Sequence, residues 1–336
     1  MKLFYNSVIE LNAGWGAEVF MERAFKKLGV QLDNLDYRKH KKHLAKEFRT
    51  RKHQRYNCFF LQRGEDYPLF LLKAISNPKF FWATELVSRR RDQHPLLRSK
   101  QFDHVFVRSQ PCRELVINRG WKNPEQVSVM SSAYDDTLFF PKQKVDRSLD
   151  VVFVGSPMRR RKEILDQLAN LGVDVHVTRA YGQELNDIYN KSKIVLNIHS
   201  ENYPDTETRV YEVLGSGSCL ISERLSAENP FVNGTHLIET DSVEEMAERI
   251  KYYLKNSVER EEIAKNGNLE ASKNHQYLNR AQQIIDMYER YNNNHNSKSL
   301  NGIVINVYSV VEPLYRVKLF FLKYGRKFHR RFIQKR

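Results

Sequence analysis

The amino-acid sequence predicts an α/β fold made of two doubly wound units in series, followed by a basic helical tail. Short apolar runs of strand length alternate with longer amphipathic segments, which is typical of a parallel sheet with helices on both faces. This alternation stops at a linker and then starts again. A length of 336 residues also favours about two domains. We place the domains at residues 1–140 and 146–291 and the tail at 292–336.

The first unit opens with a strand over Lys2–Ile9, a tight turn over Asn12–Gly16 and an amphipathic helix over Ala17–Leu28 that Gly29 ends. A second helix is predicted over Pro111–Asn118. The other strands are apolar runs bounded by turn residues, and they are Val30–Asp36, Cys58–Gln62, Lys79–Ala83, Asp103–Arg108 and Gln126–Met130.

A linker over Ala133–Lys144 precedes the second unit. Its predicted strands are Asp150–Gly155, Val173–Thr178 and Ile194–Ile198, and its predicted helices are Arg160–Leu171, Gln183–Lys191, Ser242–Asn256, Arg260–Asn274 and Asn279–Tyr291. A polar linker over Asn292–Leu300 leads to the tail. There the pattern predicts a helix over Pro313–Arg336, with Pro313 in its first turn.

The net charge of +15 comes from two segments. Residues 38–55 and 301–336 each hold nine Lys or Arg and one acidic residue, which leaves −1 for the rest of the chain. This distribution argues against a broad basic surface, so we expect no nucleic-acid partner. The three cysteines are dispersed and no secretion signal is visible, which favours a cytoplasmic location.

The most informative stretch is Val195–Ser222, which predicts a buried strand, a polar loop, a short helix and a second strand. A loop that leads into a helix at the carboxyl end of a strand is where open α/β sheets bind ligands. Arg209 and Glu212 share one face of that helix. The cation suits a phosphate and the carboxylate suits a sugar diol, although either side chain could simply be solvated or pair with the other.

Two glycine loops are further phosphate candidates. Gly155 is followed by the basic run 159–162, and we select Arg161 and Lys162 as phosphate ligands, with a solvated first helical turn as the alternative. Gly14 and Gly16 lie in the turn after the first strand, where an ordinary turn explains them equally well.

Three other polar residues lie just beyond strands or near their ends. Asn197 and His199 alternate along a strand, so they face the same side. They either contact a substrate or hydrogen-bond the neighbouring loops. Glu85 follows another strand, where its carboxylate could deprotonate an acceptor hydroxyl or serve as a helix N-terminal acid.

Several of these motifs together resemble the group 1 glycosyltransferases of the GT-B fold, and most closely their spore-maturation-type branch. The resemblance rests on Leu196–His199, Arg209, Tyr211–Glu212, Gly215–Gly217 and Cys219–Ser222, and on the flanking segments Val152–Ser156 and Tyr134–Pro141. It implies two Rossmann-like domains facing across a cleft, with an N-terminal acceptor domain and a C-terminal donor domain.

The resemblance also implies site residues and a donor. A nucleotide-diphosphate sugar would be bound without a metal. The predicted catalytic residues are Glu85, Arg209 and Glu212. The predicted substrate-binding residues are Gly14, Gly16, Gly155, Arg161, Lys162, Asn197, His199, Arg209, Tyr211 and Glu212. Many members carry a second glutamate eight residues before the one that matches Glu212, but this chain has Pro204 there.

We therefore expect an enzyme that transfers a sugar to a glycan or lipid-linked acceptor in surface polysaccharide or glycoconjugate assembly. The missing glutamate keeps open a catalytically inactive sugar-nucleotide or glycan-binding protein, and the basic segments keep open a nucleic-acid-binding protein. In the tail, apolar residues recur every three or four positions, at Leu314, Val317, Phe321, Tyr324, Phe328 and Phe332. This pattern favours peripheral contact of residues 314–336 with an anionic membrane surface over packing within the protein.

Overall fold

The computed structural model describes residues 1–10, 15–89, 91–291 and 296–333, and it describes side chains within these ranges except at 319 and 322–333. The chain forms two compact units. Unit 1 comprises Met1–Ser131 and Ala281–Arg336, and unit 2 comprises Ser132–Arg280. The sequence pattern placed residues 281–291 with the second domain and the tail apart. In the structure both segments group with unit 1.

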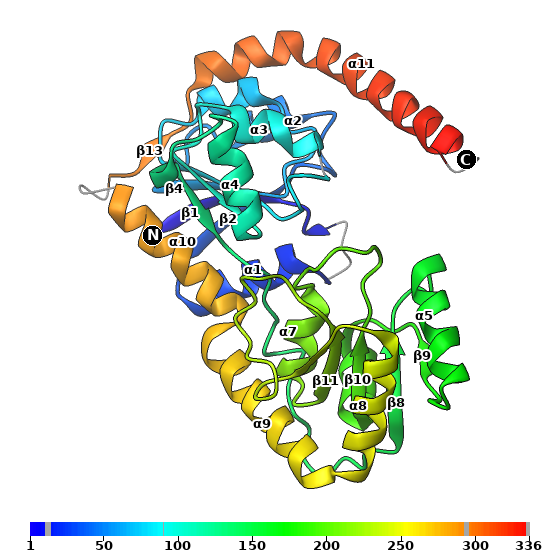
Figure 1. Ribbon diagram of the computed structural model, residues 1–336. Coiled ribbons are helices and arrows are strands. Elements are labelled where there is room, and N and C mark those ends of the chain that lie inside the picture. The colour runs from blue at the N-terminus through cyan, green and yellow to red at the C-terminus, as the bar shows by residue number, and fades with distance from the viewer. Residues whose placement is uncertain (11–14, 90, 292–295, 334–336) are drawn as a thin grey trace. The chain divides into compact units, whose positions relative to one another are not determined.

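Unit 1 is built on a six-stranded parallel sheet of order β2-β1-β4-β5-β6-β7. Figure 1 labels β1, β2 and β4 of this sheet. The strands are β1 (Lys2–Ser7), β2 (Gln31–Asp36), β4 (Cys58–Gln62), β5 (Lys79–Ala83), β6 (His104–Val107) and β7 (Val127–Val129). Its α-helices are α1 (Ala17–Lys27), α2 (Leu44–Thr50), α3 (His94–Arg98), α4 (Gln110–Asn118) and α11 (Gly302–Ile333), and η2 (Leu69–Ala74) is a 3-10 helix. The predicted bounds of β4 and β5 agree with these.

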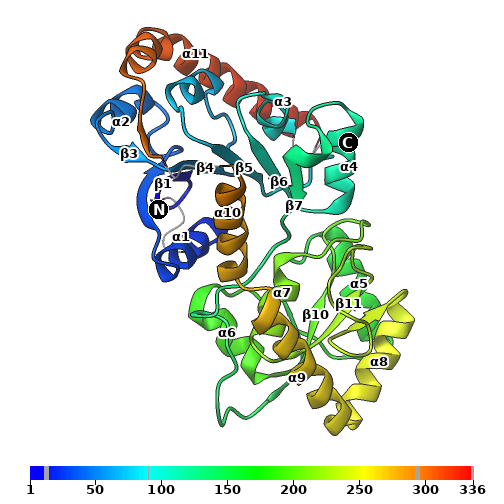
Figure 2. The ribbon, with the colours of Figure 1, turned by 90° about the vertical axis from the view of Figure 1, so that its left-hand side faces the viewer.

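Aromatic side chains fill the core of unit 1. Phe59 and Phe60 on β4 and Phe80 and Phe81 on β5 are completely buried, and the ring of Phe60 stacks on Tyr5 at 5.5 Å between centroids. Strands buried on both faces are continuous apolar runs, which is why the sequence pattern identified them. Figure 2 shows α2, α3 and α11 on one side of this sheet and α1 and α10 (Tyr277–Tyr291) on the other.

Unit 2 contains a five-stranded parallel sheet of order β12-β11-β10-β8-β9. The strands are β8 (Leu149–Val154), β9 (His176–Thr178), β10 (Ser192–Asn197), β11 (Cys219–Glu223) and β12 (Ile238–Thr240). The helices are α5 (Arg159–Asn170), α6 (Gly182–Lys191), α7 (Thr208–Gly215), α8 (Val243–Lys255) and α9 (Ser257–Asn274), and α10 crosses the boundary between the units. The predicted doubly wound architecture is therefore confirmed.

The linker before β8 packs on the end of α7. A Cβ at Gly215 would lie 2.5 Å from the ring of Tyr134, so only glycine lets the helix approach this ring. Gly217 has a φ of +71° and ends the helix against Pro141. The small residues after Glu212 therefore have a packing role.

The tail prediction was wrong about where the helix starts. Helix α11 begins at Gly302, and Pro313 lies inside it rather than in its first turn. Burial of Ile305 and Tyr308 against α2 and η2 outweighs the backbone hydrogen bond that proline removes. The basic region 38–55 contains α2, in which Leu44, Ala45 and Phe48 are buried.

Two contacts fix the C-terminal segment on unit 1. Strand β13 (Lys298–Ser299) pairs antiparallel with β3 (Arg55–Tyr56). The carboxylate of Glu312 accepts a buried 3.0 Å hydrogen bond from the backbone N–H of Ala45 in the first turn of α2. Among the described residues, no helix is both long enough and apolar enough to cross a membrane.

Candidate functional site

The candidate site in unit 2 lies where the strand order of the sheet reverses. Strands β8 and β10 are neighbours, although β9 lies between them in sequence. The loops that leave their carboxyl ends therefore diverge, and such a switch point is where open α/β sheets bind ligands. One loop begins at Gly155, and the other runs over 198–207 into the N-terminus of α7.

Two arginines share an aromatic support at this point. The guanidinium carbons of Arg161 and Arg209 lie 5.5 and 5.1 Å from the ring centroid of Phe153 on β8. Burial, together with the nearby charge of Arg209, lowers the pKa of Arg161. Two cations held together away from water favour an anionic ligand, because an anion relieves both their repulsion and their desolvation.

The other basic residues at the start of α5 point elsewhere. The side chain of Arg159 is 94% exposed and pairs with Glu163. Lys162 is exposed. Of the run 159–162, Arg161 is thus the residue that the structure brings beside Arg209.

Gly155 gives Arg209 its space. A Cβ at this position would lie 3.0 Å from Nη2 of Arg209 and 3.2 Å from the ring of Phe153. A side chain here would therefore push on both the cation and its aromatic support.

Asn197 and His199 hydrogen-bond protein groups. The amide oxygen of Asn197 accepts from Nη1 of Arg209 at 2.8 Å, and its Nδ2 donates to Ser222 at 2.9 Å. Nε2 of His199 lies 3.0 Å from the carbonyl oxygen of Arg224. Both side chains are buried, so they orient the arginine and the loop.

Glu207 was not among the predicted site residues. It is the N-cap residue of α7, and its Oε2 lies 3.4 Å from Nη1 of Arg209 and 3.6 Å from Nη2 of Arg161. Its Oε1 lies 3.5 Å from Nδ1 of His199. Burial would raise the pKa of Glu207, but the contact with His199 and the two arginine charges outweigh it and lower that pKa. One carboxylate thus occupies the space between both cations.

Glu212 is buried one turn further along α7. Burial raises the pKa of its carboxyl to about 7, and the charge of Arg209 offsets the effect only in part. Tyr211 beside it is completely buried, and its ring packs against Phe231 and His275.

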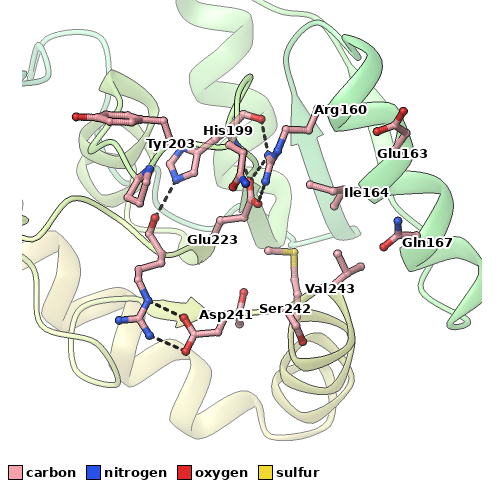
Figure 3. A pocket seen from close by; sticks show the side chains of 15 residues that line it. Arg160, Glu163, Ile164, Gln167, His199, Tyr203, Glu223, Asp241, Ser242 and Val243 are labelled. Atoms are coloured by element: carbon pink, nitrogen blue, oxygen red, sulfur yellow. Dashed lines mark hydrogen bonds and ion pairs between the residues drawn. The ribbon is translucent and has the colours of Figure 1, made fainter. Parts of the chain in front are cut away.

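Arg160 belongs to a second cluster (Figure 3). Its guanidinium forms a bidentate ion pair with Glu223 and donates to the carbonyl oxygen of His199 at 2.9 Å. The carboxylate of Glu223 also accepts from the backbone N–H of His199 at 2.7 Å. Arg160, His199 and Glu223 line a cavity of about 500 Å³, whereas Arg161 and Arg209 do not. Glu223 was not among the predicted site residues, because it ends β11 without a recognisable motif.

In unit 1, Glu85 follows β5 and lies 3.8 Å from Nη2 of Arg63, which follows β4. The same guanidinium contacts the buried carboxylates of Glu18 at 3.2 Å and Glu65 at 3.1 Å. Gly16 is the N-cap residue of α1 with a φ of 113°, and Gly14 lies outside the described residues. Within the ranges that the structure describes, no group of three or more His, Cys, Asp or Glu could hold a metal ion.

Comparison with known families explains the arrangement in unit 2. Residues 142–286 match the family described as glycosyl transferase-like. This segment is similar to a glycosyltransferase domain. The matched segment contains β8, α5, the loop over 198–207 and α7. The predicted enzyme class, a glycosyltransferase, is confirmed by this match. No curated protein matches the chain.

The glycosyltransferase is similar to several solved structures across both units. Anabaena HepE in complex with UDP is 15% identical, with a TM-score of 0.61 over 86% of this chain and 100% of that one. Sucrose-phosphate synthase from Thermosynechococcus elongatus is 12% identical, with a TM-score of 0.62 over 86% and 98%. T4 phage beta-glucosyltransferase is 11% identical, with a TM-score of 0.55 over 86% and 99%. These likenesses confirm the predicted GT-B fold.

Proposed function

We propose that this protein transfers a sugar from a UDP-sugar to a glycan or lipid-linked acceptor in the assembly of a surface polysaccharide or glycoconjugate. The observation that supports this best is the pair Arg161 and Arg209, which face one carboxylate oxygen at the N-terminus of α7. Such a place suits the diphosphate of the donor. Anabaena HepE, which is similar in fold, has been solved with UDP and with UDP-glucose.

The same cations supply the chemistry. Cleavage of the bond between sugar and diphosphate leaves negative charge on the leaving group. Arg161, Arg209 and the N-terminal N–H groups of α7 stabilise that charge as it develops. The diphosphate displaces the carboxylate of Glu207, which remains close to His199. These cations replace a metal, so we propose metal-independent transfer.

Two carboxyl groups have separate roles in this proposal. Glu212 accepts hydrogen bonds from the ribose hydroxyls of the donor, since it follows Arg209 by one turn of α7. Glu85 removes the proton from the acceptor hydroxyl, and Nη2 of Arg63 lies 3.8 Å from this carboxylate. The strand motif Leu196–His199 with Arg209 and Glu212 supports membership of the spore-maturation-type branch.

Substitution of Arg209 tests the donor site. Arg209→Ala removes a charged ligand of the diphosphate and should lower kcat/KM for the UDP-sugar about 10²- to 10³-fold, as loss of a transition-state contact does elsewhere. Arg159→Ala is the matched control, because this exposed arginine lies on the same first turn of α5 as Arg161. Near-normal turnover by Arg209→Ala would disprove the assignment.

Full activity in the presence of a chelator is expected, and its loss would refute metal independence.

Pro204 favours one alternative, a protein that binds a UDP-sugar without transferring it. The position lacks the carboxylate that the resemblance expects eight residues before Glu212. Release of free sugar from UDP-glucose by the wild-type protein, abolished by Arg209→Ala, would exclude this alternative. Binding without hydrolysis or transfer would support it.

We also propose that the enzyme works at the cytoplasmic membrane surface through α11. Its outer face is unusually apolar, since Ile303, Val310 and Leu314 are 76%, 76% and 72% exposed. No acidic residue follows Glu312, whereas the segment 313–336 holds nine Lys or Arg. An apolar stripe on a basic helix suits the interface of an anionic membrane.

A further inference from the structure

A second cavity lies in unit 1, next to α11. Its volume is about 610 Å³, within the range of about 300–1,000 Å³ that holds small-molecule ligands. One wall is the segment from Gly64 to Phe70, another is the segment from Arg91 to Leu96, and the third is α11. None of the predicted site residues lines it.

The walls of this cavity are mainly apolar. Pro68, Leu69 and Phe70 line it from the start of η2, and Val307 and Val311 line it from α11. The ring of Phe70 stacks on Tyr308 with 6.2 Å between centroids. A surface of this kind is poorly solvated by water, and an alkyl chain would gain free energy by burying it.

A few polar groups converge on the same cavity. Tyr308 and Tyr315 line it, and their buried hydroxyls have no hydrogen-bond partner among the described residues. A buried polar group left without a partner costs about 1–3 kcal/mol, so these hydroxyls favour a ligand that can bond them. Arg91 and Lys318 are exposed lining residues that carry positive charge, and Asp66 and Asp92 line the same cavity with negative charge.

The cavity is continuous with the outer face of α11. Val307 and Val311 line the cavity and remain 48% and 38% exposed. They therefore lie beside the exposed apolar stripe that contains Val310 and Leu314. A chain that leaves a membrane at this helix would enter the cavity without crossing a polar surface.

We propose that this cavity holds the hydrocarbon chain of an anionic lipid, and that this lipid carries the acceptor. The apolar walls select the chain, and the hydroxyls of Tyr308 and Tyr315 select its headgroup by donating hydrogen bonds to phosphate oxygens. The cavity lies on unit 1 beside Gly64, one residue after Arg63, which contacts Glu85. The identity of the lipid as acceptor rests on the proposed transferase function.

Calorimetric titration of the full-length protein with n-decyl phosphate tests the cavity. Val311→Phe fills it and should weaken binding about tenfold or more, which corresponds to ~1.4 kcal/mol. Val310→Phe is the matched control, because this neighbour is exposed and does not line the cavity. It should bind like the wild type. Val307→Phe fills the cavity from a second position, and fluorescence of the buried Trp82 verifies that unit 1 is folded in each variant.

Equal affinity of Val311→Phe and Val310→Phe, with unit 1 folded, would overturn the proposal. So would equal affinity of the wild type for inorganic phosphate and n-decyl phosphate, since the chain would then contribute nothing. UDP-glucose binding and turnover are measured in parallel. If n-decyl phosphate binds while UDP-sugars neither bind nor react, the transferase function fails and the lipid site stands. If UDP-sugars react but n-decyl phosphate does not bind, only the cavity inference fails.

Discussion

The buried carboxyl of Glu212 should make the enzyme less stable at neutral pH than a variant without it. Burial raises its pKa from 4.5 to about 7. At about 1.4 kcal/mol per pKa unit, keeping this group ionised in the folded protein costs about 3 kcal/mol. Glu212→Gln removes the charge and keeps the size of the side chain. This substitution should therefore stabilise the protein where Glu212 would be ionised.

The sign of the effect follows from proton binding. Between pH 4.5 and 7 the folded protein holds the Glu212 proton more tightly than the unfolded chain does. The free energy of unfolding of the wild type therefore falls as pH rises through this window, and it stays lower above pH 7. The difference between Glu212→Gln and the wild type should grow by about 3 kcal/mol from pH 4.5 to 8. In thermal unfolding this corresponds to a rise of roughly 6–10 °C in the difference in Tm.

Thermal unfolding of both proteins across this pH range measures the effect. Glu248→Gln on α8 is the control for the loss of one carboxylate, because this exposed glutamate lies in the same unit. A difference between Glu212→Gln and the wild type that stays constant with pH would refute the reasoning. The same variant should bind UDP about tenfold more weakly, because hydrogen bonds to a charged acceptor are worth about 1.5–3 kcal/mol. Unchanged UDP affinity would remove Glu212 from the donor site.

Two further substitutions should tighten the binding of UDP and weaken the binding to membranes, respectively. Glu207→Gln should lower the free energy of unfolding by about 1–3 kcal/mol, because it leaves Arg161 and Arg209 without their carboxylate. The same variant should bind UDP more tightly in calorimetry, since the diphosphate no longer displaces a charge. The stabilisation by Glu207 should be lost as pH falls through its lowered pKa. Weaker binding of UDP by Glu207→Gln would contradict the proposal that the diphosphate displaces this carboxylate. Leu314→Glu should reduce binding to phosphatidylglycerol vesicles about tenfold or more in a flotation assay. The control is Val258→Glu, at a residue on α9 of unit 2 that is 83% exposed, and it should not reduce vesicle binding. Equal losses of vesicle binding in both variants would refute a specific role of α11.

Strands and helices of both units were predictable because burial leaves a local pattern. The run Cys58–Gln62 is apolar throughout and bounded by polar residues, so its strand was found with correct bounds. Arg161 was picked from the run 159–162 without such a pattern, although its neighbours hold one. It precedes the buried Ile164, Leu165 and Leu168 by three, four and seven residues, and it therefore shares their face of α5.

Other features depend on contacts between distant residues and left no local signal. The start of α11 was missed because tertiary burial of Ile305 and Tyr308 decides it, and Pro313 suggested a helix start instead. Glu207 was missed because acidic residues before a helix are common. Only the fold brings Arg161, 46 positions earlier in the chain, to the oxygen atom of Glu207 that Arg209 also contacts.

The division of unit 1 into two chain segments has a consequence for biosynthesis. Unit 2 consists of the continuous segment Ser132–Arg280 and can fold as soon as it leaves the ribosome. Unit 1 has its sheet at the start of the chain, but β3 gains its partner β13 and Glu312 reaches Ala45 only after residue 297 has been made. Until then, the surface of α2 and η2 that α11 covers stays open to water and to chaperones. A segment that is synthesised after unit 2 thus completes the unit whose sheet is synthesised before unit 2.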